Sequence, residues 1–128
     1  MKNFLFLYLI FTSVLVGQES NDKIIYLDSL NREVTKEKHY YYKVIKDYDQ
    51  EKSEYRFLTY FKSGNIYQEG YITTKDGNEL VGEIIFYHKN GNKVNSTIFQ
   101  NGRPLGKVQK WYENGIKSEE GEFVDLEW

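Results

Sequence analysis

Five turn signals, each centred on a glycine, divide the second half of this chain into segments of nearly equal length. The glycines are Gly64, Gly77, Gly91, Gly102 and Gly115, which are separated by 13, 14, 11 and 13 residues. No segment between them shows helix-length apolar periodicity. The spacing therefore predicts an antiparallel meander, in which Gly64, Gly91 and Gly115 lie along one edge of the sheet and Gly77 and Gly102 along the other.

The residue before each turn glycine indicates the type of turn. Three of the five glycines follow an asparagine, at Asn90, Asn101 and Asn114, and Gly77 follows an aspartate. Asn-Gly and Asp-Gly pairs suit type I′ turns, because both central residues need a positive φ and the resulting twist matches paired strands. We therefore expect tight hairpins at these positions.

A five-residue pattern occurs three times, at 60–64, 87–91 and 111–115. Each copy has two ring side chains, a charged residue, a small turn-former and a glycine, and its first ring is Tyr60, Tyr87 or Trp111. One repeat of 24 to 27 residues then contains two strands and two turns. Equivalent rings lie two strands apart, or about 9.6 Å, so they cannot stack directly and the intervening strand must fill the space.

Side-chain alternation along a strand assigns the apolar residues of the repeats to two faces of the sheet. The face that carries the three rings also carries Leu58, Ile85 and Gln109. The opposite face carries Phe57, Ile84 and Val108. Because both faces hold apolar side chains, two arrangements are open: the rings form an exposed binding surface, or they form a core that the N-terminal segment covers.

Residues 18–59 read as N-terminal strands that cap the same sheet. Ring-rich or β-branched runs at 24–27, 40–48 and 55–61 predict strands, and 35–38 predicts a short helical turn. No Pro-, Ser- or Gly-rich linker separates this segment from residues 60–128, which hold about 2.5 copies of the repeat. The expected fold is all-β: stacked β-hairpin repeats in one elongated, twisted sheet.

The first 17 residues have the order of a secretory signal. Lys2 supplies a positive start, 4–16 is an apolar run broken only by Thr12 and Ser13, and Leu15-Val16-Gly17 offers a cleavage site. The run is shorter than the ~20 apolar residues that a membrane span needs. We expect a cleaved signal peptide, membrane contact only before cleavage, and an exported protein in the periplasm or outside the cell; an uncleaved anchor is the alternative.

Composition narrows the classes of function. The chain has no cysteine, which excludes disulfides, thiolate chemistry and cysteine-ligated zinc. A net charge of −2 offers no broad basic field for nucleic acid. We expect no cofactor and no metal site.

Few residues are candidates for catalysis. His88 occupies a ring position that is Phe61 and Tyr112 in the other copies, so it is interpreted as a strand filler, and His39 has no partnering motif. Five carboxylates lie near the C-terminus: Glu119, Glu120, Glu122, Asp125 and Glu127. Glu120 and Glu122 share a strand face, but the favoured interpretation is that these side chains are solvated. No catalytic residue is predicted.

The pattern resembles the bacterial variant of the MORN (membrane occupation and recognition nexus) repeat. Residues 111–115 through Glu120-Gly121 follow its ring-ring-Glu-Asn-Gly pattern, 101–106 match its linking part, and 76–82 match that part with an insertion. The resemblance covers 60–123 and implies stacked β-hairpins without a shared catalytic residue. Proteins of this kind are frequently labelled as antitoxins of toxin–antitoxin modules. The second Asn-Gly of the last copy is absent here, which predicts a strand at 119–126 on the edge of the sheet.

These observations favour a non-enzymatic, exported protein that binds another protein, with Tyr60, Tyr87 and Trp111 as the candidate surface. An antitoxin- or immunity-like role is a special case of this function, supported by the resemblance alone. The edge strand is a second route, since its unpaired backbone could accept a strand from a partner or a second copy. The alternative function is a glycan- or cell-wall-binding module of the bacterial envelope.

Overall fold

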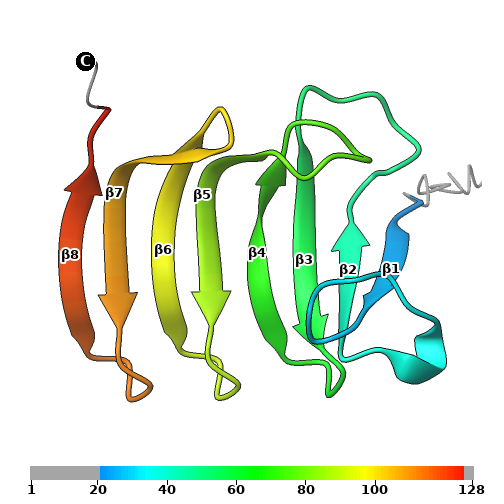
Figure 1. The fold of residues 1–128 in the computed structure, drawn as a ribbon, viewed down its shortest axis with the longest axis horizontal. Coiled ribbons are helices and arrows are strands. Elements are labelled where there is room, and N and C mark those ends of the chain that lie inside the picture. Colours follow the sequence, from blue (N-terminus) through cyan, green and yellow to red (C-terminus); the bar gives the residue numbers. More distant parts are fainter. Residues whose placement is uncertain (1–20, 126–128) are drawn as a thin grey trace, which may run out of the picture.

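The computed structural model describes residues 21–125, which form a single open antiparallel sheet with its eight strands in sequence order (Figure 1). The only helical element among these residues is the short 3-10 turn η1 (Lys36–Lys38). The predicted all-β meander is confirmed, whereas the predicted signal peptide at 1–17 lies outside the described residues. The strands are β1 (Lys23–Leu27), β2 (Tyr41–Ile45), β3 (Tyr55–Phe61), β4 (Ile66–Ile72), β5 (Leu80–Tyr87), β6 (Lys93–Gln100), β7 (Arg103–Trp111) and β8 (Lys117–Phe123).

The strands predicted at 24–27 and 55–61 lie close to their bounds, whereas two others differ. The edge strand predicted at 119–126 corresponds to β8, which begins at Lys117 and ends at Phe123. The strand expected at 40–48 ends at Ile45. Two residues later Asp47 takes a φ of 53°, in the left-handed region that extended chains do not use. The chain therefore leaves the sheet and forms the loop 46–54 before β3 begins.

The hairpins β3–β4, β5–β6 and β7–β8 share one turn geometry, which differs from the predicted type I′. In the second of them the Gly91 amide donates to the His88 carbonyl at 2.9 Å, and the His88 amide donates to the Asn92 carbonyl at 2.8 Å. Gly91 has a φ of 89°, whereas Asn90 does not have a positive φ. These are three-residue loops, a type I turn followed by a left-handed glycine that forms a bulge, because the charged residue of the repeat adds a third loop residue.

The other two turns also differ from each other. At Asn101-Gly102 both residues have positive φ, 49° and 76°, so here the type I′ prediction is correct. Asp76-Gly77 lies inside the longer loop 73–79, and neither residue has a positive φ. The turns lie at the predicted ends of the strands: Figure 1 shows the β3–β4, β5–β6 and β7–β8 turns, which hold Gly64, Gly91 and Gly115, at one end, and the β4–β5 and β6–β7 connections at the opposite end.

Asparagine side chains connect successive turns along the edge that carries Gly64, Gly91 and Gly115. Asn65 Nδ2 donates to the Lys89 carbonyl at 2.9 Å. Asn92, at the equivalent place in the next turn, donates in the same way to the Glu113 carbonyl at 2.9 Å. The third turn has Ile116 at this place, 63 % exposed. We call Asn65 and Asn92 the turn ladder. It ends at the third turn, because Ile116 has no side-chain donor.

The buried core lies on one face of the sheet, which we call the core face. Phe57, Ile72 and Ile84 are almost fully buried there, together with Ile45 and Tyr55. The register aligns Phe57 with Gly70 on β4. A Cβ on Gly70 would meet Ile84 Cδ1 at 2.3 Å, so a glycine at this position is what allows Ile84 to pack.

Two loops partly cover the core face over the first four strands. The loops 46–54 and 73–79 lie at the same end of the sheet, as Figure 1 shows. The Tyr48 hydroxyl donates to Asp76, and Lys75 lies 3.3 Å from Glu51 and 5.2 Å from the Tyr48 ring. These contacts fix the two loops to each other.

Candidate functional site

Tyr60, Tyr87 and Trp111 lie on the face opposite the core, which we call the ring face. Tyr60 faces Tyr42, and Tyr87 faces Glu69, both on this side of the sheet. All three rings are half-buried. The alternative in which they form a core under the N-terminal segment is therefore wrong for residues 21–125: β1 and β2 pair edge to edge with β3 and extend the sheet instead of covering it.

Tyr60 belongs to a continuous row of rings at the β1 end of the ring face. It stacks on Tyr42 with ring centroids 5.0 Å apart and planes 19° apart. His39 continues the row, 6.2 Å from Tyr42 and 5.0 Å from Tyr26. The His39 Nδ1 bonds the Lys36 carbonyl, which holds the ring in place. Tyr42 pairs with Tyr60 across β2 and β3, and no signal in the sequence indicated that His39 would join this row.

Tyr87 is fixed in the middle of the ring face by a polar contact. Its hydroxyl donates to Glu69 Oε1 at 2.9 Å, and Arg56 lies 3.4 Å from the other oxygen of Glu69. Burial, followed by the bond to Glu69, raises the pKa of Tyr87 to about 12. The phenol is therefore neutral at any physiological pH and acts as a hydrogen-bond donor on a half-buried carboxylate.

Trp111 lies beneath a cation at the β8 end of the ring face. Lys93 Nζ is 5.5 Å from the centre of its ring, a cation–π contact. Beyond it, Glu120 lies 3.0 Å from Lys107 and 3.1 Å from Lys117, and hydrogen bonds from these two lysines lower its pKa. Three of the four cations named on the ring face, Arg56, Lys107 and Lys117, thus contact a carboxylate, and Lys93 rests on Trp111 instead.

Three of the five C-terminal carboxylates pair with basic side chains. Glu119 pairs with Lys110 at 3.1 Å and Asp125 with Arg103 at 3.6 Å, all on exposed side chains, while Glu127 lies outside the described residues. A general acid at neutral pH needs a raised pKa, which is the opposite of what Glu120 has. The solvated interpretation stands for this cluster.

Both histidines lie within the described residues. His88 Nε2 is buried without a hydrogen-bond partner among them. Residues 21–125 hold no group of three or more His, Cys, Asp or Glu side chains placed to bind a metal. The same part of the chain contains no helix long and apolar enough to cross a membrane.

A second site, which the sequence did not indicate, lies on the core face. The loops at 28–34 and 73–79 and strands β1–β4 enclose an open hollow of about 550 Å³. Its wall is formed by side chains including Lys43, Thr59 and Gln68. In the sequence Lys43 is one lysine in a run of tyrosines, and only the strand register places it inside the hollow.

Searches against protein-family models, curated proteins and solved structures found no match to this chain.

Proposed function

We propose that this chain is a non-enzymatic binding protein of the bacterial envelope that recognises another protein through the ring face. The observation that carries the proposal is that the first ring of every repeat lies on the face opposite the core, half-exposed. Neighbouring side chains already hold each ring in one orientation, so a partner would meet a preorganised surface. Rings fixed in this way provide large contact area at low entropic cost.

The charges on the ring face favour a protein over a polyanion. Arg56 is neutralised by Glu69, and Lys107 and Lys117 share Glu120. An anionic polymer such as a charged cell-wall glycan needs a row of unpaired cations, and the ring face does not supply one. Tyrosine and tryptophan are enriched in protein interfaces, whose buried centres are depleted of charge.

The free edge of the sheet offers the same partner a second contact. At the first edge the chain folds back along β1, where Val34 N donates to the Tyr26 carbonyl at 2.9 Å and Leu27 bridges Glu33. At the other edge β8 has no strand beyond it within residues 21–125. Its predicted role as an edge strand is confirmed, and strand addition at this edge is part of the proposal.

The experiment is affinity capture from a bacterial envelope extract with the purified protein, followed by a measured affinity for the captured protein. Trp111→Ala should weaken binding roughly 10- to 30-fold, as loss of a central interface ring does. The matched control is Tyr112→Ala, which removes the adjacent ring, 61 % exposed and outside the ring face. Circular dichroism and the urea midpoint of both variants show that the fold is retained.

Three outcomes separate the functions. A stoichiometric protein partner whose binding depends on Trp111 and not on Tyr112 supports the proposal, and a partner with toxin activity gives the antitoxin- or immunity-like case. Retention on purified cell-wall polymer without any protein partner would replace the proposal by the glycan-binding alternative. Equal loss of binding in the two variants would remove the ring face from the function. Mass spectrometry of the exported protein tests the envelope location, since an intact Met1 would contradict a cleaved signal.

A further inference from the structure

The hollow on the core face contains a lysine without a counter-ion. Lys43 stands in the middle of β2 and shares the core face with Ile45, and its Nζ lies 4.6 Å from the centre of the Phe57 ring. No carboxylate or other oxygen of the described residues lies within bonding distance of this Nζ. Burial alone lowers the pKa of Lys43 below the ordinary lysine value. Lys43 is half-buried, and a partly desolvated ammonium group without an anion is costly, so an anion supplied from outside would be bound favourably.

The surroundings of Lys43 show which kind of anion would fit. The hydroxyl-bearing Thr59, only 3 % exposed, and the amide of Gln68 line the same hollow and lie opposite each other in the strand register. Both can donate a hydrogen bond to an oxyanion. The remaining wall is apolar and is formed by side chains that include Ile25, Ile45, Phe57, Ile72 and Leu80.

The other charged groups around the hollow belong to its rim and have their own partners. Lys23 lies 3.7 Å from Asp76, and Asp76 also accepts a hydrogen bond from Tyr48. Lys75 pairs with Glu51 at 3.3 Å. Glu33 borders the hollow from the loop after β1, yet it makes no ion pair with Lys43. Lys43 is thus a lining cation that makes no ion pair with the described residues.

We propose that this hollow, the Lys43 pocket, binds a small amphipathic carboxylate. The carboxylate would lie on the Lys43 ammonium with Thr59 and Gln68 as additional donors, and its apolar body would cover Phe57 and the aliphatic wall. A hollow of about 550 Å³ has the size of sites that take small organic ligands. The pocket is on the opposite face from the rings, so this inference is independent of the proposed protein partner.

Isothermal titration calorimetry with sodium octanoate, octanol and octylamine tests the proposal. The wild-type protein should bind octanoate most tightly, octanol more weakly and octylamine least, because only the first supplies the missing negative charge. Lys43→Met keeps the apolar stem and removes the charge, and it should weaken octanoate binding at least 10-fold while leaving octanol binding unchanged. The control is Lys93→Met, which removes a lysine that also rests on a ring, on the other face, and it should bind octanoate like the wild type.

A stability measurement distinguishes a binding role from a structural one. Because the pKa of Lys43 is lowered in the folded state, its protonated form opposes folding at neutral pH. Lys43→Met should therefore raise Tm in the absence of ligand, whereas a lysine that served only the fold would lower it. This combination of greater stability and lost affinity is expected of a residue kept for function.

A wild-type measurement keeps the test decisive if the variant fails to fold. In the NMR spectrum of protein labelled at lysine, octanoate should shift the side-chain signals of Lys43 and leave those of Lys93 in place. Failure of octanoate to bind, equal binding by Lys43→Met, or shifts confined to other lysines would each overturn the Lys43 pocket as a carboxylate site.

Discussion

The first and third hairpins have the same turn geometry and the same repeat pattern, yet they differ in burial. On the core face Phe57 is 1 % exposed and Phe61 is 9 % exposed. At the equivalent places of the third hairpin Val108 is only half-buried and Tyr112 is largely exposed. The backbone of a repeat is therefore fixed locally, while burial depends on what lies beside it and over it.

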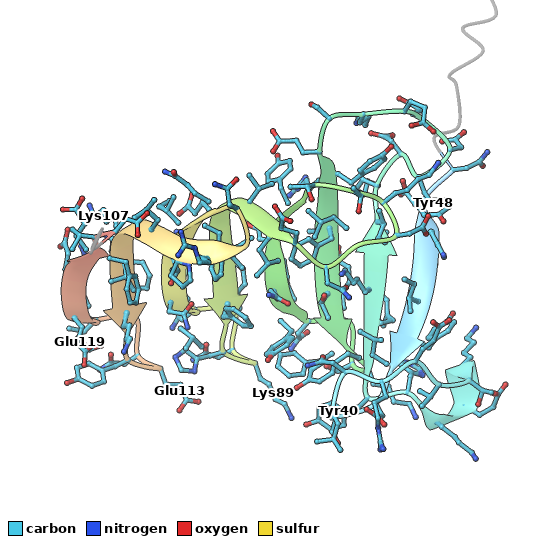
Figure 2. All side chains as sticks on the ribbon, turned by 45° about the horizontal axis from the view of Figure 1, so that its top comes forward. Tyr40, Tyr48, Lys89, Lys107, Glu113 and Glu119 are labelled. Atoms are coloured by element: carbon cyan, nitrogen blue, oxygen red, sulfur yellow. The ribbon has the colours of Figure 1, made fainter. Side chains whose placement is uncertain are left out.

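Neighbouring loops explain the difference between the two ends. Strands β1–β4 are flanked by the loops 46–54 and 73–79, which Tyr48 and Asp76 connect. At the other end of the sheet, only the two-residue turn at Asn101-Gly102 joins β6 to β7, and β8 is the outermost strand of residues 21–125. Figure 2 shows Tyr48 and Lys107 toward the strand ends that carry the long loops, and Tyr40, Lys89 and Glu113 toward the opposite strand ends. A single-layer sheet buries side chains only where loops or dense neighbours cover them, so one half of this sheet forms the core.

The largest effect should come from truncating equivalent core positions in the two halves. Ile84→Ala removes a fully buried side chain and should lower the free energy of unfolding by about 2–5 kcal/mol. Val108→Ala, at the same place one repeat later, should cost less than about 1 kcal/mol, because its side chain is already partly solvated. Urea denaturation measures both values. Equal costs would mean that the third hairpin contributes to the core as much as the second.

A smaller effect is expected at the glycines that follow the turns by six residues. Gly70→Ala should lower the free energy of unfolding by about 1–3 kcal/mol, because the new Cβ overlaps Ile84 Cδ1. Gly121→Ala should change it by no more than about 0.5 kcal/mol, since the nearest atom, on Val108, is 3.7 Å away.

The clash at Gly70 can be tested directly. Ile84→Val removes Cδ1, the atom that the new Cβ would meet. The cost of Gly70→Ala should therefore be smaller in the Ile84→Val background than in the wild type, a coupling that a double-mutant cycle measures. Strict additivity of the two substitutions would contradict the packing described for this face.

The smallest effect on stability is expected for the turn ladder, which joins successive hairpin turns at the strand ends that carry Gly64, Gly91 and Gly115. Asn65→Ala should cost about 0.5–1 kcal/mol, since it removes the single side-chain bond from the first turn to the Lys89 carbonyl. Asn92→Ala should cost less, because Asn90 also donates to the Glu113 carbonyl, at 2.8 Å. Thermal denaturation measures both, and a larger loss for Asn92 than for Asn65 would show that the two bonds to Glu113 are not redundant.

Much of the fold could be predicted from the sequence because its signals are local. The spacing of Gly64, Gly91 and Gly115 set the strand lengths and the edge on which each turn lies. Alternation placed Tyr60, Tyr87 and Trp111 on one face and Phe57, Ile84 and Val108 on the other. The type I′ turn predicted from Asn-Gly was wrong at two hairpins, β5–β6 and β7–β8, because the pair was read without the charged residue before it, which lengthens the loop by one residue.

The candidate sites depended on contacts between distant residues. The insertion at 76–82 was visible in the sequence only as a departure from the repeat, yet 73–79 folds beside β1–β4 and helps to enclose the Lys43 pocket. Lys43 itself gave no signal, because its isolation from carboxylates results from the pairing of β2 with β3 and β1 and from partners that engage Asp76 and Glu51 elsewhere.

The sequence by itself determined the strands, their order, the turn edges and the side chains that share a face, because turn chemistry and two-residue alternation act within a few residues of the chain. Only the tertiary structure decided which face is buried, because both faces carry apolar side chains and the choice depends on where the loops 46–54 and 73–79 fold. Their docking on the Phe57 side leaves Tyr60, Tyr87 and Trp111 facing outward on the side without a core.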